Sequence, residues 1–280
     1  HQDKKFSINA HVYSENDAKN QPLHQNLSEE QVSILQAAGD DMDLMTAPSA
    51  IADSFSENQI LCRKEIIEGI DAFVFSNDPD DELFSVRFSL VGNGNGNYII
   101  NSADAISRIF VFVPPVGGIP QGNYEPIVRL NAPTKLQIGG IHGSYHPSSK
   151  TNIDFELAGS QNDLNLFSSV DDGNNDGFAA RLQARQNIIT NAEKWSVTGF
   201  GSLDYINKDF RNIERLYNVE FSRDWNLQIP TGDQRFVTVG AEATSDTFGN
   251  LGYRFENLNF SENFNGIRQG ITSDIKLKKL

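Results

Sequence analysis

The feature that most constrains this chain is a series of alternating segments of up to about ten residues. In 177–189, apolar side chains such as Leu182 occupy one face, and Arg181, Gln183 and Arg185 occupy the other. Ordinary strands have about five or six residues, whereas a tilted transmembrane strand has about 9–11. Further segments of this kind are 6–13, 136–145, 153–159, 195–205, 217–227, 235–244, 251–258 and 271–280. The sequence therefore predicts an all-β fold, an antiparallel meander of long hairpins.

The connections between these segments alternate in length. Short turns at 146–150 and 190–194 lie between longer polar loops at 160–176 and 206–216, as in outer-membrane barrels. The polar face of 177–189 suits a hydrated lumen and would be a poor sandwich core. An antiparallel sheet with one solvated face shows the same alternation. We expect part of a transmembrane β-barrel, with the soluble sheet as the alternative.

The pattern divides the chain into three parts. Residues 1–13 are expected to form the first barrel strand, and residues 108–280 the antiparallel barrel hairpins. Residues 14–107 are polar and irregular, too long for an ordinary connection, and predict a mixed surface or plug-like insertion. A capping box at Ser28 and Gln31, followed by Gly39, predicts one short helix at about 29–38 within it.

Both ends of the sequence alternate like strands. We therefore expect a segment of a longer chain. The alternative is a processed domain whose terminal strands pair with each other.

The composition excludes several classes of protein. With 37 acidic and 23 basic residues, the chain lacks the excess of Lys and Arg that nucleic-acid binding requires, so we expect no nucleic-acid partner. No apolar run approaches the roughly 20 residues of a transmembrane helix. The single cysteine, Cys62, cannot form an internal disulfide, and we interpret it as a small packed residue.

One loop resembles the start of a calcium site. Asp172, Asn174 and Asp176, followed by Gly177, fit the first half of a calcium-binding loop. The twelfth position is Gln183, which cannot act as a bidentate carboxylate and lies within a predicted strand. We interpret the loop mainly as an acidic turn, with these three residues as a weak calcium candidate, and expect no other cofactor.

Other motifs predict no chemistry. Gly92, Gly94 and Gly96 do not match a dinucleotide-binding loop, and we expect a flexible turn. His142 and His146 have no third ligand nearby in the sequence, so ordinary histidines are favoured over a metal site. No G-x-S-x-G or H-E-x-x-H signature is present. We therefore expect a protein that is not an enzyme.

Four stretches resemble a known family. They are Tyr13–Pro22, Ala38–Asp41, Asp163–Asp172 and Tyr217–Leu227, and they are similar to an uncharacterised family of very large outer-membrane β-barrel proteins of the Bacteroidota. The resemblance covers most of the chain. It implies an outer-membrane barrel with elaborated surface loops, in bacteria that often carry type IX secretion and gliding systems. It implies no catalytic residues.

These observations lead to one functional expectation and two rivals. We expect a non-enzymatic outer-membrane barrel segment with a transport, secretion or envelope-scaffold role. Its partners would be outer-membrane lipid and other envelope or secretion-system proteins. The first rival is a soluble β-sandwich, secreted or at the cell surface, that binds glycan or a protein partner. The second is a β-rich glycan hydrolase that uses two of the many carboxylates.

Overall fold

The computed structural model describes residues 5–19, 26–104, 107–190 and 194–276. The chain divides into two compact units, a sheet unit and an insertion unit. The sheet unit contains the residues up to Asp17, Thr134–Leu164, and the residues from Asp171 onward. The insertion unit contains Ala18–Pro133 and Asn165–Val170.

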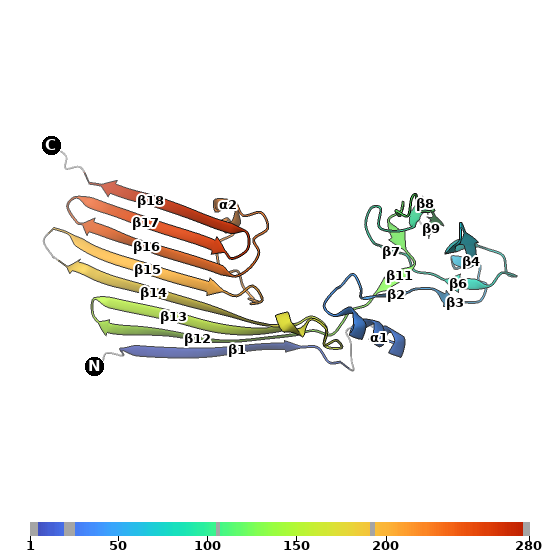
Figure 1. The fold of residues 1–280 in the computed structure, drawn as a ribbon, viewed down its shortest axis with the longest axis horizontal. Coiled ribbons are helices and arrows are strands. Elements are labelled where there is room, and N and C mark those ends of the chain that lie inside the picture. The colour runs from blue at the N-terminus through green and yellow to red at the C-terminus, as the bar shows by residue number, and fades with distance from the viewer. Residues whose placement is uncertain (1–4, 20–25, 105–106, 191–193, 277–280) are drawn as a thin grey trace. The chain divides into compact units, whose positions relative to one another are not determined.

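The sheet unit is an eight-stranded antiparallel meander with the order β1-β12-β13-β14-β15-β16-β17-β18 (Figure 1). The strands are β1 (Phe6–Asn16), β12 (Lys135–Ser148), β13 (Thr151–Asp163), β14 (Asp176–Thr190), β15 (Ser196–Ile206), β16 (Gln234–Ser245), β17 (Gly249–Phe260) and β18 (Phe264–Ile275). They have 11 to 15 residues each. The expected long-hairpin meander is confirmed. Among the described strands β1 and β18 are the two edges and do not pair, so the sheet is open.

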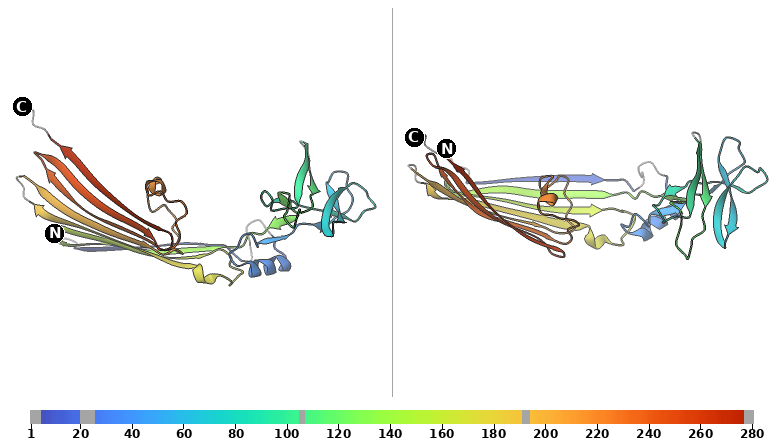
Figure 2. Two further views of the ribbon diagram at one scale, coloured as in Figure 1. Left: turned by 45° about the horizontal axis from the view of Figure 1, so that its top comes forward. Right: turned by 90° about the horizontal axis from the view of Figure 1, so that it is seen from above.

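The strands form a single twisted layer, as the two views of Figure 2 show. Bulges interrupt the register in β12 between Tyr145 and Ser148 and in β14 between Asn187 and Ile189. Bulges of this kind increase the local twist of a sheet. The connections are sorted by length. The turns 149–150 and 246–248 and the β14–β15 connection lie at one end of the sheet. The β1–β12, β13–β14 and β15–β16 connections lie at the other end, together with the short turn 261–263.

The described residues of the insertion unit form one α-helix and three small sheets. The helix α1 (Glu29–Ala38) begins with the predicted capping box, in which Ser28 and Gln31 exchange hydrogen bonds, and Gly39 follows it with φ 61°. The strands are β2 (Thr46–Pro48), β3 (Ile51–Ala52), β4 (Leu61–Ile67), β5 (Ile70–Ser76), β6 (Leu83–Ser85), β7 (Ser89–Leu90), β8 (Tyr98–Asp104), β9 (Ser107–Phe112), β10 (Tyr124–Glu125) and β11 (Ile127–Arg129). The expected short helix at 29–38 is confirmed.

Two hydrophobic clusters hold the insertion unit together. Leu35 of α1 is fully buried with Met45 and Leu130, and Tyr98 is buried with Ala72 and Phe112. The loop 165–170 also belongs to this unit. The amide of Asn165, 1% exposed, donates hydrogen bonds to the carbonyl oxygens of Leu35 (2.7 Å) and Gly39 (2.6 Å). Asn165 therefore satisfies carbonyls at the helix C-terminus that have no partner within the helix.

The boundary of the insertion differs from the one expected from sequence. Strand β1 continues to Asn16, beyond residue 13. Residues 108–133, assigned to the barrel hairpins, belong to the insertion unit, and the meander resumes at β12. The reason is long-range pairing, since β11 pairs with β2 and β10 with β7 and β8. Local alternation does not reveal such partners.

Candidate functional site

The two faces of the eight-stranded sheet have opposite chemistry. The face defined by Leu182, which we name the apolar face, carries large hydrophobic side chains on every strand. Register and alternation place on it Phe6, Ile8, Val12, Ile141, Tyr145, Leu157, Phe178, Leu182, Leu203, Val239, Leu251, Tyr253, Ile267, Ile271 and Ile275. These side chains are between 42% and 83% exposed. A contiguous exposed patch of this size marks an interaction surface.

Charged residues on the apolar face occur only near its boundary in the described strands. Lys135, Asp163, Asp176 and Arg235 all lie at the strand ends that bear the long connections. Several polar side chains within the face form hydrogen bonds between neighbouring strands, such as Tyr253 with Gln269 at 3.0 Å and Asn257 with Asn265 at 2.9 Å. The face is therefore a band without charge between these strand ends.

The opposite face, named the polar face, is crossed by ion pairs between neighbouring strands. Arg181 of β14 binds Asp204 of β15 through two hydrogen bonds of 2.9 Å, and the Asp204 side chain is only 9% exposed. Arg268 of β18 donates from Nε to Glu256 of β17 at 2.7 Å. Bidentate and charge-assisted pairs of this kind fix orientation as well as charge. The polar face is thus built for water or polar ligands and could not form an apolar core.

A further ion pair joins two strands that are not neighbours, across the strand between them. The guanidinium of Arg185 on β14 donates to the Glu242 carboxylate on β16 at 2.9 Å. It passes the ring of Phe200 on β15, whose centroid lies 5.9 Å from Arg185 Cζ and 5.7 Å from Arg254 Cζ. Sequence reasoning identified Arg181, Gln183 and Arg185, but missed Arg254, Glu256 and Arg268. The only sign of them in the sequence was that Arg254 and Glu256 are two positions apart and so share one face of a strand. Arg268 lies beside them only because of the register between β17 and β18.

The long connection 207–233 folds onto the polar face. Its short helix α2 (Phe221–Asp224) leads into Trp225, which is 7% exposed, with its ring centroid 5.7 Å from that of Phe236. Arg268 Cζ lies 4.9 Å from the Trp225 ring. Leu258, which pairs with both Phe236 and Gly266, is fully buried. The loop is therefore packed against the sheet, and its chain stands off one face of it in Figure 2.

Hydrogen bonds fix both ends of this loop. Asp233 accepts from Tyr205 Oη (2.7 Å), from Asn207 Nδ2 (3.2 Å) and from the backbone N–H of Lys208 (2.9 Å). The Tyr205 hydroxyl, followed by the amide donors, lowers the pKa of Asp233. Tyr217 donates to Asp204 at 3.2 Å, and burial raises its pKa.

The structure corrects one expected strand and separates the aromatic side chains near the strand ends. The expected strand at 217–227 is a loop that contains α2. Tyr217, Trp225 and Phe236 lie over the polar face, whereas Tyr145, Phe178 and Tyr205 lie on the apolar face. The aromatic residues near the strand ends therefore serve two surfaces.

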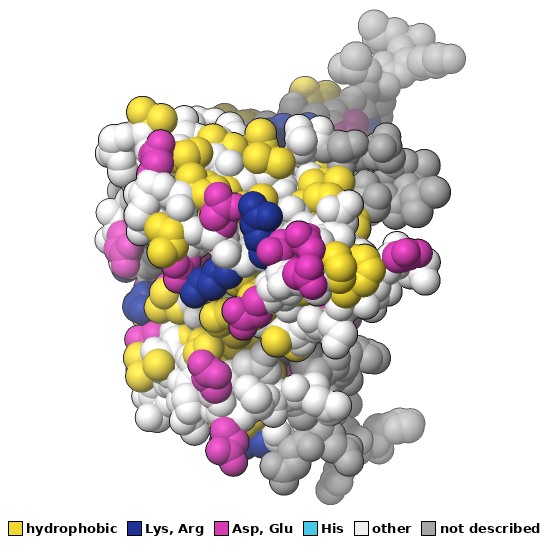
Figure 3. Space-filling model, turned by 90° about the vertical axis from the view of Figure 1, so that its right-hand side faces the viewer, with side chains coloured by type: hydrophobic (Ala, Val, Ile, Leu, Met, Phe, Trp, Pro, Cys, Tyr) yellow, Lys and Arg dark blue, Asp and Glu magenta, His cyan; other side chains and the backbone are white. Residues whose placement is uncertain are grey.

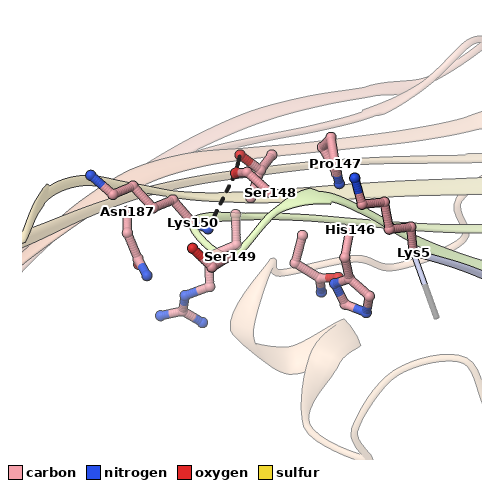
Figure 4. A pocket seen from close by; sticks show the side chains of 10 residues that line it. Lys5, His146, Pro147, Ser148, Ser149, Lys150 and Asn187 are labelled. Atoms are coloured by element: carbon pink, nitrogen blue, oxygen red, sulfur yellow. Dashed lines mark hydrogen bonds between the residues drawn. The ribbon is translucent and has the colours of Figure 1, made fainter. Parts of the chain in front are cut away.

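A hollow of about 690 Å³ lies at the short-turn end of the sheet unit (Figure 4). Its lining includes Lys5, His146, Lys150 and Arg185, together with hydroxyl-bearing side chains. In Figure 4 Lys5 and His146 lie on one side of the turn, and Lys150 lies with Asn187 on the other. Lys5 and Lys150 therefore lie on different sides of the turn and do not converge on one point.

The calcium candidates lie in the connection between β13 and β14. Asp172 and Asn174 are the ends of a short 3-10 helix, and Asp176 is the first residue of β14. Asp172 accepts a hydrogen bond from Asn175 Nδ2 at 3.0 Å. Gln183 lies on the polar face far along β14. Within the described ranges no group of three or more His, Cys, Asp or Glu side chains is arranged to hold a metal ion.

The remaining sequence candidates are dispersed. His142 lies on the polar face opposite Glu156, whereas His146 lies within the bulge of β12, where its backbone N–H donates to the carbonyl oxygen of Lys5. Cys62 is buried in the insertion unit, and burial raises the pKa of its thiol to about 11, so it is a poor nucleophile at neutral pH.

The molecular surface reflects the formal net charge of −14. Figure 3 shows a face on which Asp and Glu side chains lie among exposed hydrophobic ones, with fewer Lys and Arg. No helix in the described part of the chain is long and apolar enough to cross a membrane.

Comparison with known proteins identifies no relative: no family model matches the chain, and neither does a curated protein or a solved structure.

Proposed function

We propose that the eight-stranded sheet is part of an outer-membrane β-barrel, with the apolar face toward lipid and the polar face toward the lumen. The observation that carries this proposal is the exposed apolar face, which is continuous across all eight strands and lies opposite a face of ion pairs. Water is a poor solvent for the first face, and a hydrophobic core is a poor environment for the second.

The dimensions of the sheet support this proposal. On β14 the apolar side chains extend from Phe178 to Ile188, about 11 residues or roughly 35 Å of strand. A tilt of about 45° reduces this length to roughly 25 Å across the bilayer, the height of the apolar band of outer-membrane barrels. The sorting of connections into short turns at one end and mostly long loops at the other is also typical of such barrels.

The rival soluble sandwich requires a second layer. A sandwich core forms where two sheets bury their inner faces against each other. Leu157, Leu182 and Leu203 lie in the middle of the apolar face and are 53%, 49% and 42% exposed, so none of the described strands covers them. This exposure favours lipid over a sandwich core.

The two edge strands of the sheet need pairing partners in a membrane. Unpaired backbone groups are not tolerated in hydrocarbon, so in a membrane β1 and β18 must pair, with each other or with further strands. The insertion unit leaves the sheet at the end that carries the long connections, which in outer-membrane barrels is the extracellular end. A surface or plug-like domain in transport, secretion or envelope scaffolding fits this topology.

Site-directed spin labels test the proposal. With Cys62 replaced by alanine, single labels are placed at residues 182 and 183 of the chain in lipid vesicles. We expect the label at 182 to be relaxed by oxygen and the label at 183 by a water-soluble nickel complex, because adjacent residues point to opposite faces. Equal accessibility of the two labels to both relaxants would refute the proposal.

A further inference from the structure

The polar face contains a second hollow, of about 420 Å³, between β15 and β18. Glycines make room for it. No heavy atom lies within 4 Å of the position that a Cβ of Gly270 would occupy, and a Cβ at Gly252 would come within 2.7 Å of Thr272 Oγ1 and 3.8 Å of Glu242 Cγ. Side chains of ordinary size at these two positions would fill the hollow.

Two guanidinium groups at this hollow have donors to spare. Arg254, with a side chain 57% exposed, makes no hydrogen bond within the described residues, and its Nη1 lies 3.8 Å from Glu256 Oε1. Arg268 uses Nε for Glu256, and no hydrogen bond from the described part of the chain occupies its two terminal nitrogens. Each guanidinium carries five N–H donors, and planar oxyanions bind such groups in a bidentate manner.

The local charge balance is opposite in sign to that of the chain. Arg254, Arg268, Glu242 and Glu256 line the hollow, and Arg185 lies beside it, near the Phe200 ring and paired with Glu242. Each carboxylate already has a guanidinium partner, and one positive charge is left over. A ligand with one oxyanion would neutralise this charge, whereas a cationic ligand would be repelled.

The rest of the lining selects for hydroxyl groups. Glu242, 49% exposed, retains acceptor capacity, and Thr272 can both donate and accept. The volume is at the lower end of the range for small-molecule sites. We propose that this hollow binds a monosaccharide-sized polyol that carries one oxyanion, a carboxylate or a phosphate ester.

The site does not require the membrane proposal, because it depends only on the polar face. If the sheet lines a barrel, the hollow is a solute-binding site in the lumen. If the spin labels refute the barrel, the same arginines and glycines still form the hollow, so the two proposals fail separately.

Trp225 provides an intrinsic reporter of binding. Its ring lies against the Arg268 guanidinium, and replacement of Trp195 by phenylalanine leaves it as the sole tryptophan. The folded chain is titrated with glucuronate and with glucose 6-phosphate, which distinguish the two sources of the oxyanion. Glucose and inorganic phosphate are titrated in parallel. We expect one of the two charged sugars to change the Trp225 emission with saturation, and to bind at least tenfold more tightly than glucose or phosphate.

Two variants locate the site, and a third is their control. Gly270→Val fills the hollow without changing charge, and Arg254→Gln removes a guanidinium whose N–H groups make no hydrogen bond within the described residues. Each should weaken binding about tenfold or more, the equivalent of one charge-assisted hydrogen bond. Gly139→Val is the matched control, because Gly139 also has open space around its Cβ position but lies on the apolar face, and it should bind normally. Arg268→Gln is a weaker test, because it leaves Glu256 buried without its partner.

Every outcome bears on the proposal. Saturable binding that Gly270→Val and Arg254→Gln weaken, and Gly139→Val does not, supports it. Three results would overturn it. They are absence of binding up to about 10 mM of either sugar, binding of phosphate as tight as that of the sugars, and binding that Gly270→Val does not weaken.

Discussion

Residues 182 and 183 provide the sharpest comparison between the two faces of the sheet. Leu182 lies on β14 between Phe155 of β13 and Leu203 of β15, and Gln183 lies on the other face between Asp154 and Ser202. Both are near the middle of the strand, and both are exposed. Leu182→Arg therefore tests whether lipid or water surrounds the apolar face, and Gln183→Leu is its matched control.

The expected cost of Leu182→Arg in folding free energy differs between lipid and water. In a barrel, Leu182→Arg places a charge near the bilayer midplane, at a cost of about 2–4 kcal/mol, which is a factor of roughly 30 to 1,000 in the folding equilibrium. In water, a half-exposed surface position tolerates the change within about 0.5 kcal/mol. Gln183→Leu should cost little in either case, because lumen positions tolerate exchange.

The measurement is reversible folding of the chain from denaturant into lipid vesicles, followed by the fluorescence of Trp195 and Trp225. The difference between the free energies of folding of the two variants is the quantity of interest. A difference below about 0.5 kcal/mol would refute the assignment of the apolar face to lipid, whatever the absolute stability.

Three other predictions concern the loops. Asn165→Leu should destabilise the insertion unit by about 1–3 kcal/mol, because it leaves two buried carbonyls at the end of α1 without their donor; urea unfolding checks this, and an unchanged midpoint would contradict it. The pKa of Asp233 is lowered first by the Tyr205 hydroxyl, so its stabilisation of the loop 207–233 should be complete above the unfolded pKa of about 3.9 and be lost as the pH falls through the lower folded value. Hydrogen exchange of the loop measures this loss, which Asp233→Asn should abolish. Calorimetric titration with calcium should detect no site tighter than about 10⁻⁴ M, and a micromolar site lost on Asp176→Ala would show the interpretation of that loop to be wrong.

Local patterns predicted the strands and the helix where local chemistry determines them. The alternation around Leu182 located β14, and the capping box at Ser28 located α1 to the residue. In the turn between β4 and β5, Glu68 and Gly69 both have positive φ, as a two-residue hairpin turn requires. Such features depend only on residues that are close in sequence.

The segment around α2 shows why alternation can mislead. Tyr217, Phe221 and Trp225 are spaced four apart, which fits one face of a helix as well as one face of a strand. In the structure the first two rings stack at 4.1 Å, and the third lies 6.5 Å from the second. Their partner, Phe236, is supplied by the sheet. Only tertiary contact decides between the two periodicities.

The hollow near Arg254 was inaccessible to sequence reasoning for a related reason. Arg254 and Arg268 lie on neighbouring strands, and the register that brings Arg268 opposite Glu256 is set by the whole hairpin. A shift of one residue would move every side chain of a strand to the other face. Candidate binding residues on a sheet therefore become visible only when the pairing is known.

The two faces and the two edges of the sheet each set a condition on the medium around the sheet unit. An open sheet with an exposed apolar face and two unpaired edges is prone to association in water. Placed in lipid, the apolar face is satisfied, but each unpaired backbone group of β1 or β18 costs several kcal/mol. The polar face adds the condition that Arg181, Asp204 and Glu256 meet water or one another and not hydrocarbon. Closure in a membrane meets all three conditions at once, because it pairs the edges, turns the apolar face to lipid and encloses the ion pairs around water. The comparison of Leu182→Arg with Gln183→Leu tests this reasoning directly, since closure predicts opposite tolerance on the two faces of the same strand.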